Sequence, residues 1–167
     1  MFTESNTVES LIVDLLCGPQ PPVGRVVRDE QAPYVTVGRS KRGTGWHYVA
    51  PAFLPRQPQD VFVDSYVREA LIRLNPAIAE HPDRADEVIY RLRAIVLSVR
   101  SDGLIKANEE FTAWLRGDRS MPFGPHHEHV TVRLIDFDDL DANQYVATTQ
   151  LTFRAGPARK VSCVVAT

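Results

Sequence analysis

One stretch of the chain, residues 130–153 (VTVRLIDFDDLDANQYVATTQLTF), most constrains the fold that the sequence can adopt. Residues 130–137 alternate between two faces, with Val130, Val132 and Leu134 on one of them. Residues 145–153 are rich in β-branched and aromatic side chains, which is typical of a strand. The residues between these segments are mostly Asp and Asn, whose side chains bond nearby backbone in turns. The pattern predicts two strands of one sheet, joined as a β-hairpin or a strand–loop–strand unit.

Length and composition predict a single globular domain, residues 1–167. A chain of this size can bury about 68–70% of the surface that it exposes when unfolded. Its 44% apolar and 24% charged residues are ordinary for a globular protein. No apolar run approaches the roughly 20 residues that span a bilayer, and the N-terminus lacks the features of a secretory signal. We therefore expect a cytoplasmic protein with no membrane partner.

The charge balance weakens one class of function, and the cysteines argue against a disulfide-rich protein. The net charge is −2, from 19 basic and 21 acidic residues, which weakens the case for a chain that grips DNA over its whole surface. Two cysteines, Cys17 and Cys163, do not make a disulfide framework. We expect both to be buried thiols.

The N-terminal part of the chain predicts one helix and one long loop. A helix is expected over 7–17, with Asn6 as its N-cap and Glu9 completing a capping box. Residues 19–45 are rich in Pro and Gly and are expected to form a mobile basic loop. Three residues of this loop, Arg39, Lys41 and Arg42, are candidate contacts to a phosphate backbone; a solvated linker is the alternative.

Helices are expected over 60–117, and strands on either side of that block. Three apolar stripes at helical spacing predict helices over 60–74, over 83–99 and from Leu104 to Gly117. Gly103 is expected to separate the last two. Short strands are expected at 46–49 and 160–167, the latter completing a sheet over 130–167. Together these elements predict an α+β (α/β) fold in which about four helices cover a small, mostly antiparallel sheet.

Several segments carry residues that are more specific than their hydrophobic pattern. In chain order they are Gly45-Trp46, residues 68–76 (REALIRLNP), 108–111 (NEEF), 115–117 (LRG), 134–138 (LIDFD), Asn143 and residues 150–153 (QLTF). Together they resemble the N-terminal region of the R subunit of type I restriction enzymes. In that family an IDF segment, an Asn and a Q-x-T strand lead into the nuclease core.

The resemblance implies a PD-(D/E)xK nuclease, in which strand Asp and Glu residues hold Mg²⁺ and a Lys two residues past the Glu orients the attacking water. Clustered carboxylates suit this hard cation, which activates water and offsets charge on the phosphate. Glu9 matches an acid that many relatives carry in their first helix. It is therefore a candidate catalytic residue and Mg²⁺ ligand, with the capping box as the alternative. Asp136 is a second catalytic candidate beside the metal; the alternative is that Asp136 and Asn143 pin their loop.

The chain departs from the family pattern at the remaining catalytic positions. Ser162 stands where the strand Asp is expected, if the family's Asn-Gly would follow directly after Thr167. No (D/E)-x-K element and no Walker A loop occur anywhere in the sequence, so the ATP-driven motor of an R subunit would lie outside this chain. We expect an N-terminal fragment with an incomplete nuclease fold, cut before the catalytic core is complete. Whether it is an enzyme by itself stays uncertain.

The resemblance also implies partners, and two other classes of function compete with it. The parent R subunit would cleave unmodified DNA in a Mg²⁺- and ATP-dependent manner, together with methylation and specificity subunits. The first alternative is a non-catalytic module that docks DNA or protein in a restriction complex. The second is an independent metal-dependent hydrolase that uses His126, His127 and His129. Adjacent residues of an extended run point to opposite sides, which argues against a shared zinc site.

Overall fold

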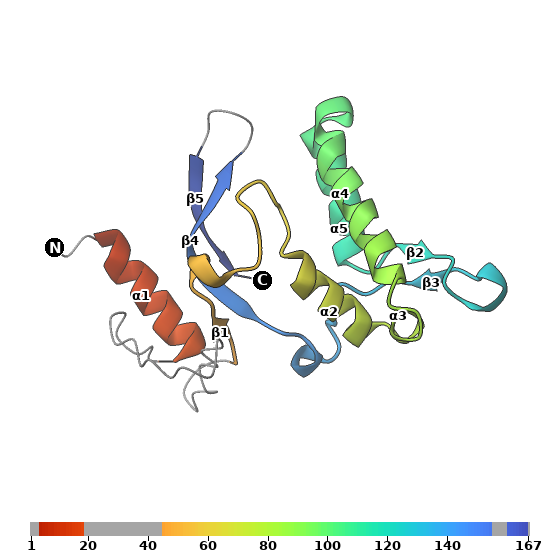
Figure 1. The fold of residues 1–167 in the computed structure, drawn as a ribbon, viewed down its shortest axis with the longest axis horizontal. Coiled ribbons are helices and arrows are strands. Elements are labelled where there is room, and N and C mark those ends of the chain that lie inside the picture. The colour runs from red at the N-terminus through yellow and green to blue at the C-terminus, as the bar shows by residue number, and fades with distance from the viewer. Residues whose placement is uncertain (1–3, 19–44, 155–159, 167) are drawn as a thin grey trace. The chain divides into compact units, whose positions relative to one another are not determined.

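The computed structural model describes residues 4–18, 45–154 and 160–166, with five α-helices and five strands among them (Figure 1). This mixture of helices and small sheets confirms the predicted α+β class. The chain divides into two compact units, which are described separately: residues 1–61 with 145–167, and residues 62–144. The more specific expectations, an incomplete PD-(D/E)xK fold and a single domain, stay predictions.

The first unit contains a three-stranded sheet. Its strands are β1 (His47–Tyr48), β4 (Val146–Arg154) and β5 (Lys160–Ala166), in the order β1-β4-β5. Strand β1 runs parallel to β4, whereas β4 and β5 are antiparallel. The strands predicted at 46–49 and 160–167 are therefore confirmed, although β1 is shorter than expected. Residues 19–44 of the segment predicted as a mobile loop lie outside the described residues.

Helix α1 (Glu4–Cys17) packs against this sheet. Val13 and Cys17 are buried together with Ala147 of β4, and Leu16, Trp46 and Tyr48 pack around them. The Tyr48 hydroxyl also forms a 3.1 Å hydrogen bond with the Thr149 hydroxyl. Apolar contact with the strands thus positions α1. The expected buried thiol is confirmed for Cys17, and burial and the nearby Asp14 carboxylate raise its pKa.

The predicted start of the first helix is wrong. The helix begins at Glu4 rather than at residue 7, so Asn6 lies inside its first turn and is not the N-cap. Glu9 therefore does not occupy the capping-box position. A helix can begin earlier than its best capping residue because water can satisfy the amides of its first turn. The predicted end at Cys17 is confirmed.

The second unit is a helical block with a small hairpin. It contains α2 (Asp64–Leu74), α3 (Pro76–Ala79), α4 (Arg84–Asp102) and α5 (Leu104–Leu115), which confirms the helices predicted over 60–117. Helix α2 starts four residues later than predicted. Gly103 separates α4 from α5 with a φ of 87°, a backbone conformation that favours glycine. The core residues are Leu71, Ile78, Ala85, Val88, Ile89, Leu92, Trp114, Met121, Phe123 and Val132.

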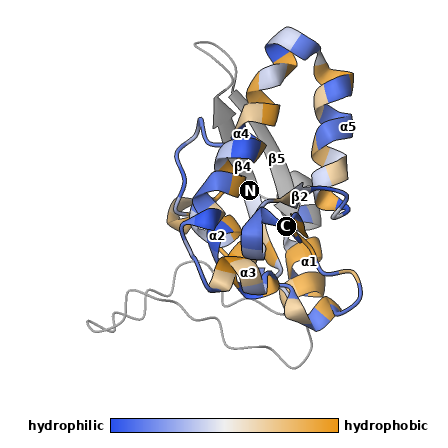
Figure 2. Cartoon of the chain, turned by 90° about the vertical axis from the view of Figure 1, so that its right-hand side faces the viewer, coloured by the Kyte–Doolittle hydropathy of each residue, from blue (hydrophilic) through white to orange (hydrophobic). Residues whose placement is uncertain are grey.

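Hydrophobic and hydrophilic residues alternate along α4 and α5 (Figure 2), as expected for helices that each bury one face. The fully buried Val88 and Leu92 of α4 lie on the buried face. Among the described residues, no helix combines the length and the apolar character needed to cross a membrane.

The predicted pairing of residues 130–137 with 145–153 is wrong. Strand β3 (Val130–Thr131) ends after two residues and pairs with β2 (Ser120–Met121), while β4 pairs with β1 and β5 in the other sheet. The physical reason lies in residues 132–144, where side chains rather than a neighbouring strand satisfy much of the backbone, as described below. Alternating polarity there reflects partial burial, not an extended strand.

Candidate functional site

Asp136, the candidate acid of the LIDFD segment, is bound by its own loop. Its Oδ1 accepts hydrogen bonds from the backbone amides of Asp138 and Asp139, both at 3.0 Å. Its Oδ2 accepts a 3.1 Å bond from Nη1 of Arg133, which is also an ion pair. A carboxylate offers about four acceptor positions, and three of them are filled here. The arrangement is that of a side chain that organises a turn.

These contacts also set the charge state of Asp136. The amides of Asp139 and Asp138, helped by the charge of Arg133, hold the pKa of this carboxyl below its ordinary value; partial desolvation opposes them. A general base needs a pKa near the working pH, whereas a lowered pKa makes a carboxylate a weaker base. Asp136 is therefore suited to accepting hydrogen bonds rather than to taking up a proton.

Asn143 closes the loop that Asp136 opens. Its Oδ1 accepts from the Asp136 amide at 2.9 Å, and its Nδ2 donates to the Asp136 carbonyl at 2.7 Å. Between them, the Asp139 carboxylate accepts from the Asp141 amide at 3.1 Å and caps a short 3-10 helix, Leu140–Ala142. The alternative interpretation, that Asp136 and Asn143 pin the loop between the strands, is confirmed.

Asn75 connects this region to the helices, and sequence reasoning missed it. The residue is 5% exposed, and its carboxamide makes three hydrogen bonds. Nδ2 donates to the carbonyls of Leu71 (2.9 Å) and Arg133 (2.8 Å), and Oδ1 accepts from the Arg133 amide at 2.7 Å. Arg73 adds a 2.9 Å bond from Nε to the Ala142 carbonyl. The sequence indicates only that Asn75-Pro76 ends a helix; it contains no signal for the bonds to residue 133.

The remaining candidate residues come from other parts of the chain. Glu9 is partly exposed on α1 in the first unit, whereas Asp136 belongs to the second, and a shared metal site of the two stays a prediction. Ser162 pairs with Thr152 in the ladder between β5 and β4. The three candidate DNA contacts, Arg39, Lys41 and Arg42, lie outside the described residues.

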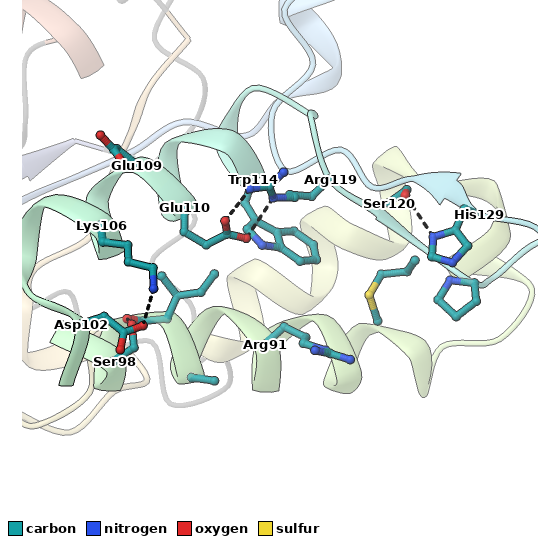
Figure 3. A pocket seen from close by; sticks show the side chains of 14 residues that line it. Arg91, Ser98, Asp102, Lys106, Glu109, Glu110, Trp114, Arg119, Ser120 and His129 are labelled. Carbon is teal, nitrogen blue, oxygen red and sulfur yellow. Dashed lines mark hydrogen bonds and ion pairs between the residues drawn. The ribbon is translucent and has the colours of Figure 1, made fainter. Parts of the chain in front are cut away.

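A cleft of about 840 Å³ lies between α4, α5 and the β2 segment (Figure 3). Glu110 and Arg119 form a two-point ion pair across it, with Nε to Oε1 at 2.9 Å, and Lys106 pairs with Asp102 at 3.5 Å. The hydrogen bond from Arg119 is the main cause that lowers the pKa of Glu110. Three basic side chains (Arg91, Lys106, Arg119) and three acidic ones (Asp102, Glu109, Glu110) line the cleft, and this balance of charge makes it a poor site for a phosphate backbone.

The histidine-rich loop does not have the extended backbone assumed from its sequence. His126 and His127 both have positive φ, 56° and 63°. His129 instead forms a 3.1 Å hydrogen bond between its Nδ1 and the hydroxyl of Ser120, and both side chains are exposed. Among the residues that the structure describes, no three His, Cys, Asp or Glu side chains lie close enough together to hold a metal ion.

Comparison with known protein families identifies the family of the chain. Residues 39–163 match the family model described as type I restriction enzyme R protein N terminus. These residues include the whole second unit, strands β1 and β4 of the first, and the first four residues of β5. No curated protein and no solved structure matches the chain.

Proposed function

Because this chain belongs to the family of type I restriction enzyme R protein N termini, we propose that it works as the N-terminal region of an R subunit in a DNA restriction complex. The observation that carries this proposal is the family match over residues 39–163, which is most of the chain. The parent enzyme would cleave unmodified DNA with Mg²⁺ and ATP, together with methylation and specificity subunits.

The contacts in the second unit support a scaffolding role for the family-like residues. Three of the segments that carry the resemblance meet in one network: Asn75 binds the backbone of Arg133, Arg133 pairs with Asp136, and Asp136 bonds to Asn143. Each residue in this network binds either the backbone or the charged side chain of the next one. We infer that this network fixes the path of residues 133–143 against α2, rather than performing a chemical step.

The residues of this chain do not fit the metal site of a PD-(D/E)xK nuclease. Asp136 uses its carboxylate oxygens within its own loop, Ser162 offers a neutral hydroxyl where a carboxylate is expected, and the sequence lacks the (D/E)-x-K element. Glu9 alone would be a weak ligand, because hard cations are held by several oxygen ligands. We therefore propose that the chain does not cleave DNA alone.

Two measurements test the proposal. Purified chain incubated with supercoiled plasmid and Mg²⁺ is expected to leave the plasmid uncut, and a Glu9→Gln variant is expected to behave identically. Nicking by the chain that Glu9→Gln abolishes would overturn the non-catalytic assignment.

The second measurement concerns the complex. The chain, joined to the remainder of an R subunit, is expected to co-purify with the methylation and specificity subunits and to support ATP-dependent cleavage of unmodified DNA. Failure of such an R subunit to assemble or cleave, while one with a related N-terminal region succeeds, would reject the proposed role. The expected DNA contact is tested separately. Salt-dependent binding of duplex DNA by the chain is expected to be lost in the Arg39→Gln, Lys41→Gln and Arg42→Gln variants.

A further inference from the structure

One face of α4 leaves a stripe of side chains uncovered. Tyr90, Ala94, Leu97 and Ser101 follow one another at intervals of four, three and four residues, and all four are exposed. Tyr90 is 74% and Leu97 is 70% exposed, unusual values for large apolar side chains on a helix that already buries another face. At 3.6 residues per turn this stripe lies on the side of α4 opposite the core residues Val88 and Leu92. We call these four residues the outer stripe.

The spacing of the outer stripe is that of a helix–helix seam. Alternating intervals of four and three residues keep side chains in line along a helix, so that a second helix can pack against them. Single exposed apolar residues are common on protein surfaces, but an aligned set points to an interaction surface. Two more exposed apolar residues, Leu104 and Ile105, begin α5 directly after α4 ends.

The charges beside the outer stripe indicate what kind of helix fits. Arg91 flanks it on one side, and Arg93 and Arg100 flank it on the other. Arg93 is paired with Asp64, whereas the guanidinium groups of Arg91 and Arg100 make no hydrogen bond or ion pair with the described residues. Figure 3 shows Arg91 extending from α4 without such a partner.

The acidic residues of α4 leave this middle part of the helix basic. They are Asp86, Glu87 and Asp102, in its first and last turns. Asp86 is paired with Arg68 and Asp102 with Lys106, whereas the exposed Glu87 lies one turn before Arg91. The flanks of the stripe therefore carry unpaired positive charge between those ends.

The flanking arginines favour one kind of binding partner for the outer stripe over two others. A second copy of this chain that packed stripe on stripe would bring arginines near arginines, an arrangement that costs energy in a low-dielectric interface. Nucleic acid would meet the arginines but would leave the apolar surface of Leu97 uncovered. An amphipathic helix with acidic flanks satisfies both, since its apolar face covers Tyr90 and Leu97 while its carboxylates pair with Arg91 and Arg100.

We propose that the outer stripe of α4 is a docking site for an acidic amphipathic helix of another protein. The docked helix lies along α4, with its apolar residues between Tyr90 and Leu97 and its acidic residues over the flanking arginines. This site is separate from the network around Asp136, and it holds whether or not the chain takes part in DNA cleavage.

A synthetic helical peptide serves as the probe. It carries Leu at the seam positions, Glu at the flanking positions, a covalent staple that keeps it helical as a monomer, and a fluorophore for anisotropy measurements with the full chain. The peptide is expected to bind the wild-type chain, and to bind the Leu97→Ser variant with at least tenfold weaker affinity. Arg100→Gln is expected to weaken the affinity several-fold, and this difference from the wild type becomes smaller at high salt. A matched peptide with Lys in place of Glu is expected not to bind.

Two variants control for unspecific effects. Phe137→Ser removes an apolar side chain that is 63% exposed on the 136–143 loop. Arg116→Gln removes an exposed arginine at the end of α5, as Arg100→Gln does near the end of α4. Both are expected to bind the Glu peptide as the wild type does.

Three results would overturn the proposal. The first is no binding of the Glu peptide at millimolar concentration by a folded chain. The second is equal binding of the Lys peptide or of the Leu97→Ser variant. The third is a dimer in sedimentation, or a duplex DNA complex, that Leu97→Ser disrupts, because either would assign the stripe to another occupant.

Discussion

The carboxamide of Asn75 pairs with the peptide of Arg133 much as a neighbouring strand would. Oδ1 accepts from the Arg133 amide at 2.7 Å and Nδ2 donates to the Arg133 carbonyl at 2.8 Å, across 58 residues of sequence. Asn75 itself is buried, so its carboxamide binds the backbone of residue 133 at a partly buried position. One amide thereby joins the end of α2 to the segment that leads into the Asp136 loop.

Replacement of Asn75 by Ala is expected to lower the free energy of unfolding by about 2–3 kcal/mol. The change removes three hydrogen bonds of the carboxamide, one of them buried, and takes this partner away from both the amide and the carbonyl of Arg133. Urea unfolding followed by circular dichroism measures the effect. Asn108→Ala, on the exposed side of α5, is the control and is expected to change stability by less than about 0.5 kcal/mol. Equal effects of the two substitutions would contradict the role assigned to Asn75.

Asp136 is expected to make the stability of the chain depend on pH in the acid range. Its folded pKa is lowered, so its contribution is fully present above the unfolded value of about 3.9 and is lost as pH falls through the folded pKa. Asp136→Asn should therefore flatten the decline of the urea midpoint below about pH 5. Glu110 also has a lowered pKa, so some decline persists. Asp138→Asn is the control; a decline flattened equally by both would refute this assignment.

The ion pair between Glu110 and Arg119 is expected to contribute little to stability despite its two-point geometry. Its side chains are 40% and 42% exposed, and exposed pairs are worth about 0–1 kcal/mol because water and salt screen them. A double-mutant cycle with Glu110→Gln and Arg119→Gln measures the coupling free energy. We expect a value below about 1 kcal/mol that falls further at 1 M salt. A coupling of several kcal/mol, insensitive to salt, would show that the cleft is far less hydrated than inferred.

Two leucines of the helical block are expected to respond very differently to truncation. Leu71 has no exposed surface, so Leu71→Ala should cost about 2–5 kcal/mol through lost burial and the cavity that it leaves. Leu97 is 70% exposed, so Leu97→Ala should change stability by less than about 0.5 kcal/mol. Thermal unfolding of both variants checks this contrast. A large loss for Leu97→Ala would mean that the outer stripe is already covered within the chain.

Local sequence patterns were enough to predict the helical elements of the second unit, and residue identities were enough to predict the family of the chain. Apolar residues at helical spacing located α4 and α5, and Gly103 marked the boundary between them, because these signals act between residues a few positions apart. The family resemblance likewise depends on residue identity and order. Neither needs knowledge of which distant segments meet.

Strand pairing and the contacts of the family-like polar residues depend instead on which distant parts of the chain meet in the folded protein. Residues 130–131 pair with β2 instead of β4, although alternation and turn chemistry predicted the opposite. The reason is that a segment can satisfy its backbone either with a strand or with side chains, and here Asn75 and Asn143 supply those side chains. The partner of residue 133 lies 58 positions away, and no local pattern encodes that distance.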